Sequence, residues 1–381
     1  MTPEPRHSPI VPSYGAATLA DLSSSMLASL DPEAPESQNV LGLPPARRAC
    51  LLIVDGLGWE LLRDHPAVAP FLSELARNSK PIMAGFPSTT VTSLGSICTG
   101  RPPGQHGMLG YQVIIPGENR LLNGLRWDSR VDPRRWQPLP TIYERAAAAG
   151  IAAVHVAQGA FRGTGLTIAT MRGADFRPAD SMGALAAQAA AALWENGRGF
   201  VTVYHGDLDN TGHVFGVGSD AWYNQLAHVD KLAEQLASAL PSGTFMYVTA
   251  DHGMVDIGPE DKFDVDATPE LRSGLALLGG EPRARHLYAR RGAAADLLAT
   301  WRDVLGDRAW VLSRDEAVKE GWFGPVDPAM ADRIGDVVAA PAGSMAIVAT
   351  KAEPRESALA GMHGSLTSSE QLVPALTYTA T

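Results

Sequence analysis

Cysteine is scarce in this chain of 381 residues, which contains only Cys50 and Cys98. Two cysteines make no disulfide framework, so we expect reduced, buried thiols, although a single bridge between them is compatible with the sequence. No apolar run approaches the length that crosses a bilayer. The N-terminus lacks the charged region and the apolar region of a signal peptide. We therefore expect a soluble, cytoplasmic protein without a membrane partner.

Long basic runs are missing as well. The chain carries 31 Lys and Arg residues against 41 Asp and Glu residues, which gives a net charge of −10. A nucleic-acid polymer is therefore a poor candidate partner, because its phosphates would meet an acidic protein. A small anionic substrate stays compatible, since bound divalent metal ions would reverse the field locally. Nothing in the sequence predicts the oligomeric state.

The order of the expected elements indicates a doubly wound α/β fold. Helical segments separate apolar runs that are typical of strands covered on both faces, and these runs lie at 49–54, 152–157, 200–204 and 244–249. Strands that alternate with helices in this way form a mainly parallel sheet. A fifth run, at 345–349, is expected to return the chain to the same sheet.

We expect the chain to be divided into an N-terminal arm, a main domain and a cap. Residues 1–47 are rich in Pro, Ser and Ala and form the arm, with one helix at 17–30. The main α/β domain takes residues 48–260 and 342–381. Between these two parts, residues 261–341 break the alternation and are expected to form a small inserted α+β cap.

Acidic residues and histidines gather in four short segments that are far apart in the sequence. Three segments follow strand-like runs and the fourth is a glycine-flanked loop, and their residues are Asp55, Asp209, His213, Asp251, His252 and His363. The carboxyl ends of parallel strands face one crevice, so these side chains can meet there. Three carboxylates and three imidazoles would form two cation sites of mixed nitrogen and oxygen ligation, which suits zinc and tolerates manganese.

Each segment alone also has a structural explanation. Asp55 can cap the following helix, and a dinucleotide-binding loop after it is disfavoured because the G-x-G-x-x-G spacing is absent. Asp209 and His213 share a helix face, whereas Asp207 would point elsewhere. The other seven histidines, including His106, are expected to be structural. The combination of the segments favours a catalytic site.

Hydroxyl side chains crowd the segment FPSTTVTSLGSICTG at 86–100, which we expect to be a turn that enters a helix. They can serve as helix caps. A hydroxyl at a helix N-terminus beside a cation can also lose its proton and attack phosphorus, while the free N–H groups hold the phosphate oxygens.

These motifs resemble those of the alkaline phosphatase superfamily, in its nucleotide pyrophosphatase/phosphodiesterase (type I phosphodiesterase) branch. The family segment F-P-T-K-T-F-P-N-H-Y-S-I-V-T-G is similar to residues 86–100 without a gap, which places its nucleophilic threonine on Thr90. Its motifs Y-x-x-x-x-D-x-x-G-H-x-x-G, D-H-G-M and H-G fall on residues 204–216, 251–254 and 363–364. The resemblance implies an alkaline phosphatase-like main domain.

The resemblance also implies a site with two divalent metal ions, expected to be Zn²⁺ with Mn²⁺ as the alternative. One ion would be held by Asp209, His213 and His363, and the other by Asp55, Thr90, Asp251 and His252. Thr90 would attack phosphorus in line and form a phosphothreonine intermediate. The family asparagine three residues after the nucleophile is Ser93 here, whose hydroxyl would have to take over its contact with a phosphoryl oxygen.

The expected function is metal-dependent hydrolysis of phosphodiester or pyrophosphate bonds in small anionic, nucleotide-type substrates. A phosphomonoesterase or phosphonate hydrolase of the same superfamily is the alternative. A mutase is disfavoured because such relatives use serine, and a sulfatase because the segment from Cys98 to Arg101 lacks the proline of C-x-P-x-R. A non-catalytic metal- or nucleotide-binding protein is the alternative from another class, and only Ser93 favours it. In the cap, we expect a solvated basic face at Arg283, Arg285 and His286.

Overall fold

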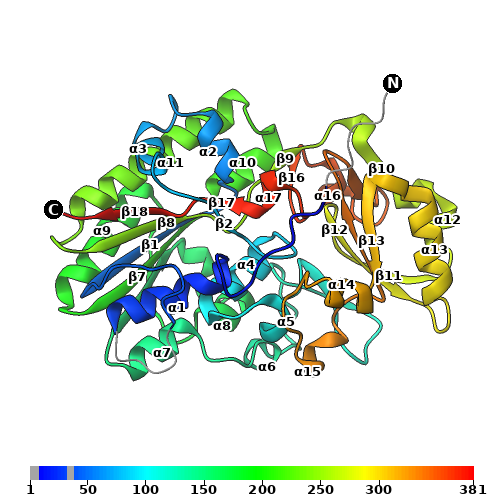
Figure 1. Cartoon of the computed structure of the whole chain (residues 1–381), viewed down its shortest axis with the longest axis horizontal. Helices are drawn as coiled ribbons and strands as arrows, with labels where there is room; N and C mark the ends of the chain where they lie inside the picture. Colours follow the sequence, from blue (N-terminus) through cyan, green and yellow to red (C-terminus); the bar gives the residue numbers. More distant parts are fainter. Residues whose placement is uncertain (1–7, 32–37) are drawn as a thin grey trace.

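The computed structural model describes residues 8–31 and 38–381, and its largest element is a six-stranded sheet in the main domain (Figure 1). The strands run in the order β18 (Leu376–Thr379), β8 (Phe245–Thr249), β1 (Arg48–Val54), β7 (Gly199–His205), β5 (Ala152–Ala157) and β6 (Asp175–Pro178). All neighbours pair in parallel except β18, which is antiparallel to β8. The expected doubly wound, mainly parallel α/β fold is confirmed.

The three central strands of this sheet determine where the segments that carry the acidic residues begin. Strand β1 is flanked by β7 and β8, and it is buried from Ala49 to Val54 because it has a neighbour on each side and helices on both faces. The register pairs Val54 with His205 and Ile53 with Thr249. The three strands therefore end side by side, and the segments that follow them start at one edge of the sheet.

Helices cover both faces of the sheet (Figure 1). One face carries α3 (Pro70–Ala76), α9 (Met182–Glu195) and α11 (Asp220–Ala239), and the other carries α1 (Leu19–Leu30), α4 (Thr90–Thr99) and α7 (Ile142–Ala148). The helix of the N-terminal region is part of the main core, where Leu19, Leu22 and Met26 of α1 are fully buried. Among the described residues, no helix is long and apolar enough to cross a membrane. Cys50 and Cys98 are buried and unpaired.

A smaller antiparallel sheet stands beside the main domain and falls within the segment expected to form the cap. Its four strands run in the order β11 (Leu275–Glu281), β12 (Ala284–Ala289), β14 (Val337–Pro341) and β13 (Ala309–Ser313). Helix α13 (Ala294–Leu305) buries Leu297, Trp301 and Leu305 in a core of its own with this sheet. This core is separate from the core of the six-stranded sheet.

The expected return of residues 345–349 to the main sheet is wrong. Strand β15 (Ala346–Val348) pairs in parallel with β10 (Lys262–Asp264) in a separate two-stranded sheet. The chain is still beside the cap at this point, because Ile347 donates its N–H to the Pro282 carbonyl at 2.8 Å and packs in the core of the cap. The last strand of the main sheet is β18 instead.

The expected solvated basic face of the cap is also wrong, because its three side chains are fully buried. Arg283 donates to Glu370 with Nε at 3.0 Å, and Arg285 forms an ion pair with Glu353 at 2.8 Å. His286 Nε2 lies 2.9 Å from the carbonyl oxygen of Leu109. Buried cations need such partners, and here the partners lie outside the cap sheet and tie it to the rest of the chain.

Candidate active site

The six acidic and histidine residues singled out in the sequence meet at the carboxyl edge of the main sheet. Asp55 follows β1 directly, and Asp251 and His252 follow β8. Helix α10 (Asp207–Phe215) follows β7 and carries Asp209 and His213. His363 follows β16 (Gly361–Met362), which pairs with β9 (Val255–Asp256) after β8. The donor atoms form two groups, in each of which all three lie within 4.8 Å of one another.

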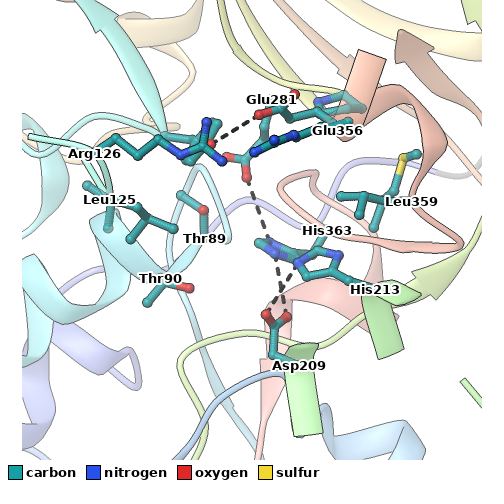
Figure 2. A pocket seen from close by; sticks show the side chains of 15 residues that line it. Thr89, Thr90, Leu125, Arg126, Asp209, His213, Glu281, Glu356, Leu359 and His363 are labelled. Atoms are coloured by element: carbon teal, nitrogen blue, oxygen red, sulfur yellow. Dashed lines mark hydrogen bonds and ion pairs between the residues drawn. The ribbon is translucent and has the colours of Figure 1, made fainter. Parts of the chain in front are cut away.

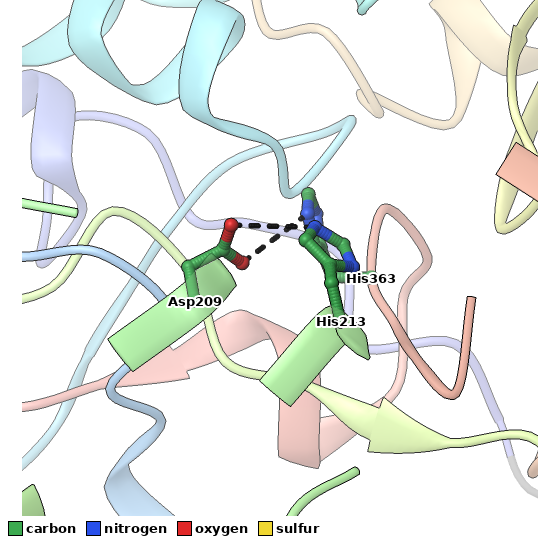
Figure 3. Close-up of side chains that lie close together, drawn as sticks. All are labelled: Asp209, His213 and His363. Carbon is green, nitrogen blue, oxygen red and sulfur yellow. Dashed lines mark ion pairs between the residues drawn. The ribbon is translucent and has the colours of Figure 1, made fainter. Parts of the chain in front are cut away.

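The first group, Asp209, His213 and His363, is partly exposed, and we call it the open group (Figure 3). Nε2 of His213 lies 3.3 Å from one oxygen of Asp209, and Nε2 of His363 lies 3.7 Å from the other. The opposite ring nitrogens meet carbonyl oxygens, those of Gly361 at 2.7 Å and Ser88 at 3.0 Å. A protonated Nδ1 on each ring leaves the Nε2 lone pair for a cation.

The second group, Asp55, Asp251 and His252, is buried, and we call it the buried group. Nε2 of His252 lies 3.2 Å from Oδ1 of Asp55 and 3.6 Å from Oδ2 of Asp251. The same nitrogen lies 3.3 Å from the hydroxyl of Thr90, and Nδ1 lies 2.9 Å from the Gly253 carbonyl oxygen. The group thus presents two carboxylates and one imidazole to a single point beside the Thr90 hydroxyl.

The two groups are adjacent, since the rings of His252 and His363 stack at a centroid distance of 3.6 Å. Oδ1 of Asp209 and Oδ2 of Asp251 are buried and have no hydrogen-bond partner among the described residues. A buried carboxylate oxygen without a partner is costly. In the buried group Oδ1 of Asp55 is a second oxygen of this kind. Such oxygens in each group, beside imidazole nitrogens whose other side is already bonded, fit one cation in each group.

The burial and crowding of the carboxylates shift their pKa values. Burial raises the pKa of Asp55 to about 8, and repulsion from Asp209 adds to the effect. Burial likewise raises the pKa of Asp251 well above its usual value. Burial opposes ionisation of Asp209 too, but the neighbouring His213 outweighs it and leaves the pKa of Asp209 lowered. The surroundings of the buried group therefore disfavour the ionised form of both its carboxyls, because its one imidazole does not compensate two negative charges.

Neighbouring residues fix the carboxylates of the buried group in place. The hydroxyl of Tyr204 donates to Oδ2 of Asp55, and the N–H of Gly56 donates to Oδ1 of Asp251 at 3.1 Å. Gly56 has a φ of +75°, and a side chain there would press against Asp209. Such supporting contacts hold ligand side chains in position.

Thr90 is the first residue of α4, and its hydroxyl points toward the buried group. Thr89 before it has an extended backbone, and the helix begins directly after it. The first N–H groups of a helix have no partner within the helix, so this end is suited to an anion. Thr90 is thus placed where a phosphoryl group would meet both the hydroxyl and the helix N-terminus.

A cavity of about 250 Å³, which we call the charged cavity, opens over Thr90 and the open group (Figure 2). Its polar wall includes Tyr111, Arg126, Glu281, Arg355 and Glu356. The Tyr111 hydroxyl donates to Glu356 at 3.3 Å. The cavity therefore combines the candidate nucleophile, one donor group and both signs of charge in one space, as a site for a small polar ligand requires.

Glu281 is a site residue that the sequence reasoning missed. Its side chain is buried, Oε1 has no hydrogen-bond partner among the described residues, and Oε2 lies 3.9 Å from His363 Nδ1. Burial raises the pKa of its carboxyl to about 8, although a hydrogen bond from Thr89 opposes the shift. The Gly-Gly pair before it was the available signal. Gly280 has a φ of +78°, and a side chain there would clash with the Ala284 carbonyl oxygen, so β11 and β12 approach closely directly before Glu281.

Ser93 lies within α4, one turn after Thr90, and is fully buried. Its N–H donates to the Thr89 carbonyl at 2.9 Å, and its hydroxyl has no partner among the described residues. It is not one of the residues that line the cavity. Contact of Ser93 with a phosphoryl oxygen therefore stays a prediction.

Two other motif residues lie outside the donor groups. Asp207 begins α10 and accepts a hydrogen bond from Gln158 at 3.3 Å. His106 is buried, and its Nε2 lies 3.0 Å from the hydroxyl of Ser96 on α4. Burial lowers the pKa of His106 to about 3, so it is a neutral packing residue.

The fold and the site together define a mainly parallel α/β protein of hydrolase type, with two Asp/His donor groups and a hydroxyl at a helix N-terminus. The family described as type I phosphodiesterase / nucleotide pyrophosphatase matches residues 49–366. The chain belongs to this family, which confirms the resemblance of its motifs and makes it a phosphodiesterase-type enzyme. A comparison with curated protein sequences found no match.

Solved structures of this family share the fold. Human ectonucleotide pyrophosphatase/phosphodiesterase 5 superposes with a TM-score of 0.68 at 18% sequence identity, over 87% of this chain and 87% of that one. An inactive variant of murine ectonucleotide pyrophosphatase/phosphodiesterase 5 in complex with AMP has a TM-score of 0.69 at 17% identity, with 87% of each chain covered. At this identity the likeness concerns the fold.

Proposed function

We propose that this protein is a metal-dependent hydrolase of phosphodiester or pyrophosphate bonds with Thr90 as its nucleophile. The observation that carries the proposal is the position of the Thr90 hydroxyl. It lies 3.3 Å from His252 Nε2, at the start of α4, on the wall of a cavity shared with the open group. Family membership supports the type of bond that is cleaved.

Two divalent cations complete the proposed site, with Zn²⁺ expected and Mn²⁺ compatible with the same donors. The open group would hold one ion, and the buried group together with Thr90 would hold the other. When bound, the ions supply Lewis-acid chemistry and neutralise negative charge that develops on the reacting oxygens.

Thr90 and the start of α4 carry out the two displacements at phosphorus. The Thr90 oxygen attacks phosphorus in line with the leaving oxygen, forms a phosphothreonine and releases the first product. Water then attacks the same phosphorus, which frees Thr90 and the second product. The N–H groups of the first turn hold phosphoryl oxygens through both displacements. Ser93 is proposed as a further donor, which would require its hydroxyl to reach the cavity.

Small nucleotide-type phosphoesters are the proposed substrates. The cavity of about 250 Å³ offers Arg126 and Arg355 to anionic groups and Tyr111 to a ring. The AMP bound to the murine relative supports this class by analogy. A phosphomonoesterase or phosphonate hydrolase is the second candidate, because the same Thr90 and donor groups would serve it. Above about pH 8, where its carboxyl is ionised, Glu281 disfavours it, since a carboxylate beside the open group repels the second charge of a monoester.

The test compares kcat/KM for bis-p-nitrophenyl phosphate and p-nitrophenyl phosphate on zinc-loaded protein. We expect the diester to be preferred and Thr90→Ala to lose at least about a thousandfold in activity, with zinc content unchanged by elemental analysis. Thr92→Val is the matched control. It removes a buried hydroxyl two residues along α4 that has no hydrogen-bond partner among the described residues, and it should retain activity. Retained activity in Thr90→Ala would exclude Thr90 as the nucleophile.

A further inference from the structure

His363 is the first residue of a loop, residues 363–367, which we call the His363 loop. Nδ1 of His363 lies 3.0 Å from the Ser88 carbonyl oxygen, and the Ser88 N–H donates to the Gly364 carbonyl at 3.0 Å. Ser88 precedes Thr90 by two residues. These bonds fix one side of the loop to the segment that carries the candidate nucleophile.

The hairpin of β11 and β12 in the cap packs against the other side of this loop. Gly364 has a φ of +133°, and a Cβ added there would lie 3.1 Å from Cγ of Glu281 and 3.2 Å from Cβ of Ala284. Oε2 of Glu281 lies 3.9 Å from Nδ1 of His363 (Figure 2). The hairpin and the loop therefore approach so closely that little room is left for a side chain beside His363.

A buried ion pair anchors the hairpin to the loop. Arg283, in the turn of the hairpin, donates to both oxygens of Glu370 on α17 (Ser368–Gln371), with Nε to Oε1 at 3.0 Å and Nη2 to Oε2 at 2.5 Å. Oε1 of Glu370 also accepts the Ser365 N–H at 3.0 Å, and Oε2 accepts the Thr367 hydroxyl. Glu370 thus connects Arg283 of the cap with two residues of the His363 loop.

The pair has the character of a positioning device. Arg283 and Glu370 are both fully buried, and the third guanidinium nitrogen, Nη1, donates to the Met345 carbonyl. Two parallel bonds between an arginine and a carboxylate fix their distance and their angle. A buried ion pair stabilises a fold little compared with apolar side chains of similar volume. Its tight geometry is therefore the larger contribution here.

We propose that Arg283 and Glu370 are positioning residues that hold His363 where its Nε2 can bind the cation of the open group. The inference rests on the proposed function, because it takes the open group as a cation site. Neither residue belongs to the open group or lines the charged cavity. Their effect therefore runs through the position of His363, and the cap takes part in metal binding without supplying a ligand.

The test measures stepwise zinc binding by competition with a chromophoric chelator, so that turnover is not required. The open-group step is identified as the one that His213→Gln weakens. We expect Arg283→Met to weaken this step by about ten- to hundredfold, as is usual for residues that support a metal ligand, and to leave the buried-group step within about threefold. An unchanged open-group step, or an equal loss in both steps, would overturn the inference.

Arg285→Met is the matched control. Arg285 lies two residues further along the chain, is also fully buried, and pairs with Glu353 at 2.8 Å, outside the His363 loop. Its replacement removes the same positive charge as Arg283→Met, and that loss alone favours a nearby cation. The open-group affinity should therefore stay at or above that of the parent protein. A loss equal to that in Arg283→Met would indicate a general defect of the cap and overturn the inference.

A double variant covers the case in which the unpaired Glu370 prevents folding. Arg283→Met with Glu370→Leu replaces both charges by apolar side chains, a change that other proteins tolerate without loss of stability. We expect the midpoint of urea unfolding of the metal-free protein to stay close to that of the parent, and the open-group step to weaken by about ten- to hundredfold. Parent-like zinc affinity in this variant would contradict the inference.

The parent protein separates this inference from the proposed function. A parent protein that binds fewer than two zinc ions would contradict the proposed site and the inference with it. A parent that binds two ions and hydrolyses the diester through Thr90, while the Arg283 variants keep the open-group affinity, would contradict the inference alone.

Discussion

The open group and the buried group contain similar donors but lie in different surroundings. In the open group the side chain of His213 is 21% exposed and that of Asp209 is 13% exposed, whereas His252 and Asp251 of the buried group are fully buried. Only the open group lines the charged cavity. The buried group instead touches the hydroxyl of Thr90. One group thus faces the ligand, and the other faces the nucleophile from inside the protein.

The difference has an electrostatic consequence. In the open group two imidazoles surround one carboxylate, so the group balances its own charge when a histidine is protonated. In the buried group two carboxylates surround one imidazole, and burial raises the pKa of both carboxyls. We therefore expect the buried group to hold its cation more tightly and to depend on it more strongly.

Asp251→Asn should have the largest effect, because it removes a charge from the buried group. We expect activity on bis-p-nitrophenyl phosphate to fall by about a thousandfold or more, and zinc content to fall from two ions to one. Added zinc should not restore activity, since the lost ligand is fully buried. Steady-state kinetics and elemental analysis provide the measurement. Full zinc content with normal turnover would show that Asp251 is not a ligand.

His213→Gln should disrupt the open group and lower activity less than Asp251→Asn does. Its side chain is partly exposed, and solvent can replace one ligand there. We expect activity to fall by about a hundredfold and to recover in part with excess zinc. His205→Gln is the control, because His205 lies at the end of β7 outside both groups. An equal loss in both histidine variants would indicate a general packing defect.

Removal of the metals should make stability depend on pH. The folded pKa of Asp55 is raised to about 8 from 3.8, so between these values the folded state binds more protons than the unfolded state. The free energy of unfolding of the metal-free protein should therefore fall as pH rises, by up to about 1.4 kcal/mol per pH unit for one such group. His213, with a pKa raised from 6.5 to about 9, acts in the same direction above pH 6.5.

The measurement is urea unfolding of chelator-treated protein between pH 6.5 and pH 8, with zinc-loaded protein alongside. The loaded protein should lose this slope, because the cations replace the protons. Asp55→Asn should reduce the slope in the metal-free protein. A flat profile for the metal-free protein would mean that the buried carboxylates are compensated in some other way.

The sequence predicted those features of the site that depend on the order of the strands. The runs that became β1, β7 and β8 were apolar throughout, and polar residues at their ends necessarily meet at one edge of a parallel sheet. This is why Asp55, Asp209 and Asp251 could be placed together from the pattern alone. The start of α4 at Thr90 was visible for a similar reason, since the hydroxyl-rich turn precedes a helix.

The cap could not be placed in this way, because antiparallel pairing leaves no rule for which end faces the main domain. The sequence suggested a basic face at Arg283 and Arg285, whereas their partners Glu370 and Glu353 lie far along the chain and bury both cations. The same hairpin turn brings Glu281 to the charged cavity. Residues that reach the site through long-range packing, unlike those at strand ends, are marked in the sequence only by a local feature. For Glu281 this feature is the Gly-Gly pair before it.

Glu281→Gln should have the smallest effect on activity. It tests the side of the site that faces the ligand, in contrast to the buried group. Its carboxyl lies in the charged cavity beside His363 of the open group, on the cap side (Figure 2). The assays are run above about pH 8, where the Glu281 carboxyl is ionised. A dianionic monoester carries one more charge than a diester, so a carboxylate there penalises the monoester more. The neutral amide should raise kcat/KM for p-nitrophenyl phosphate severalfold relative to the diester. Glu356→Gln is the matched control, and a smaller change is expected because that carboxyl is bonded to Tyr111. If both variants leave the ratio of the two substrates unaltered, charge in this cavity does not determine the choice between diester and monoester.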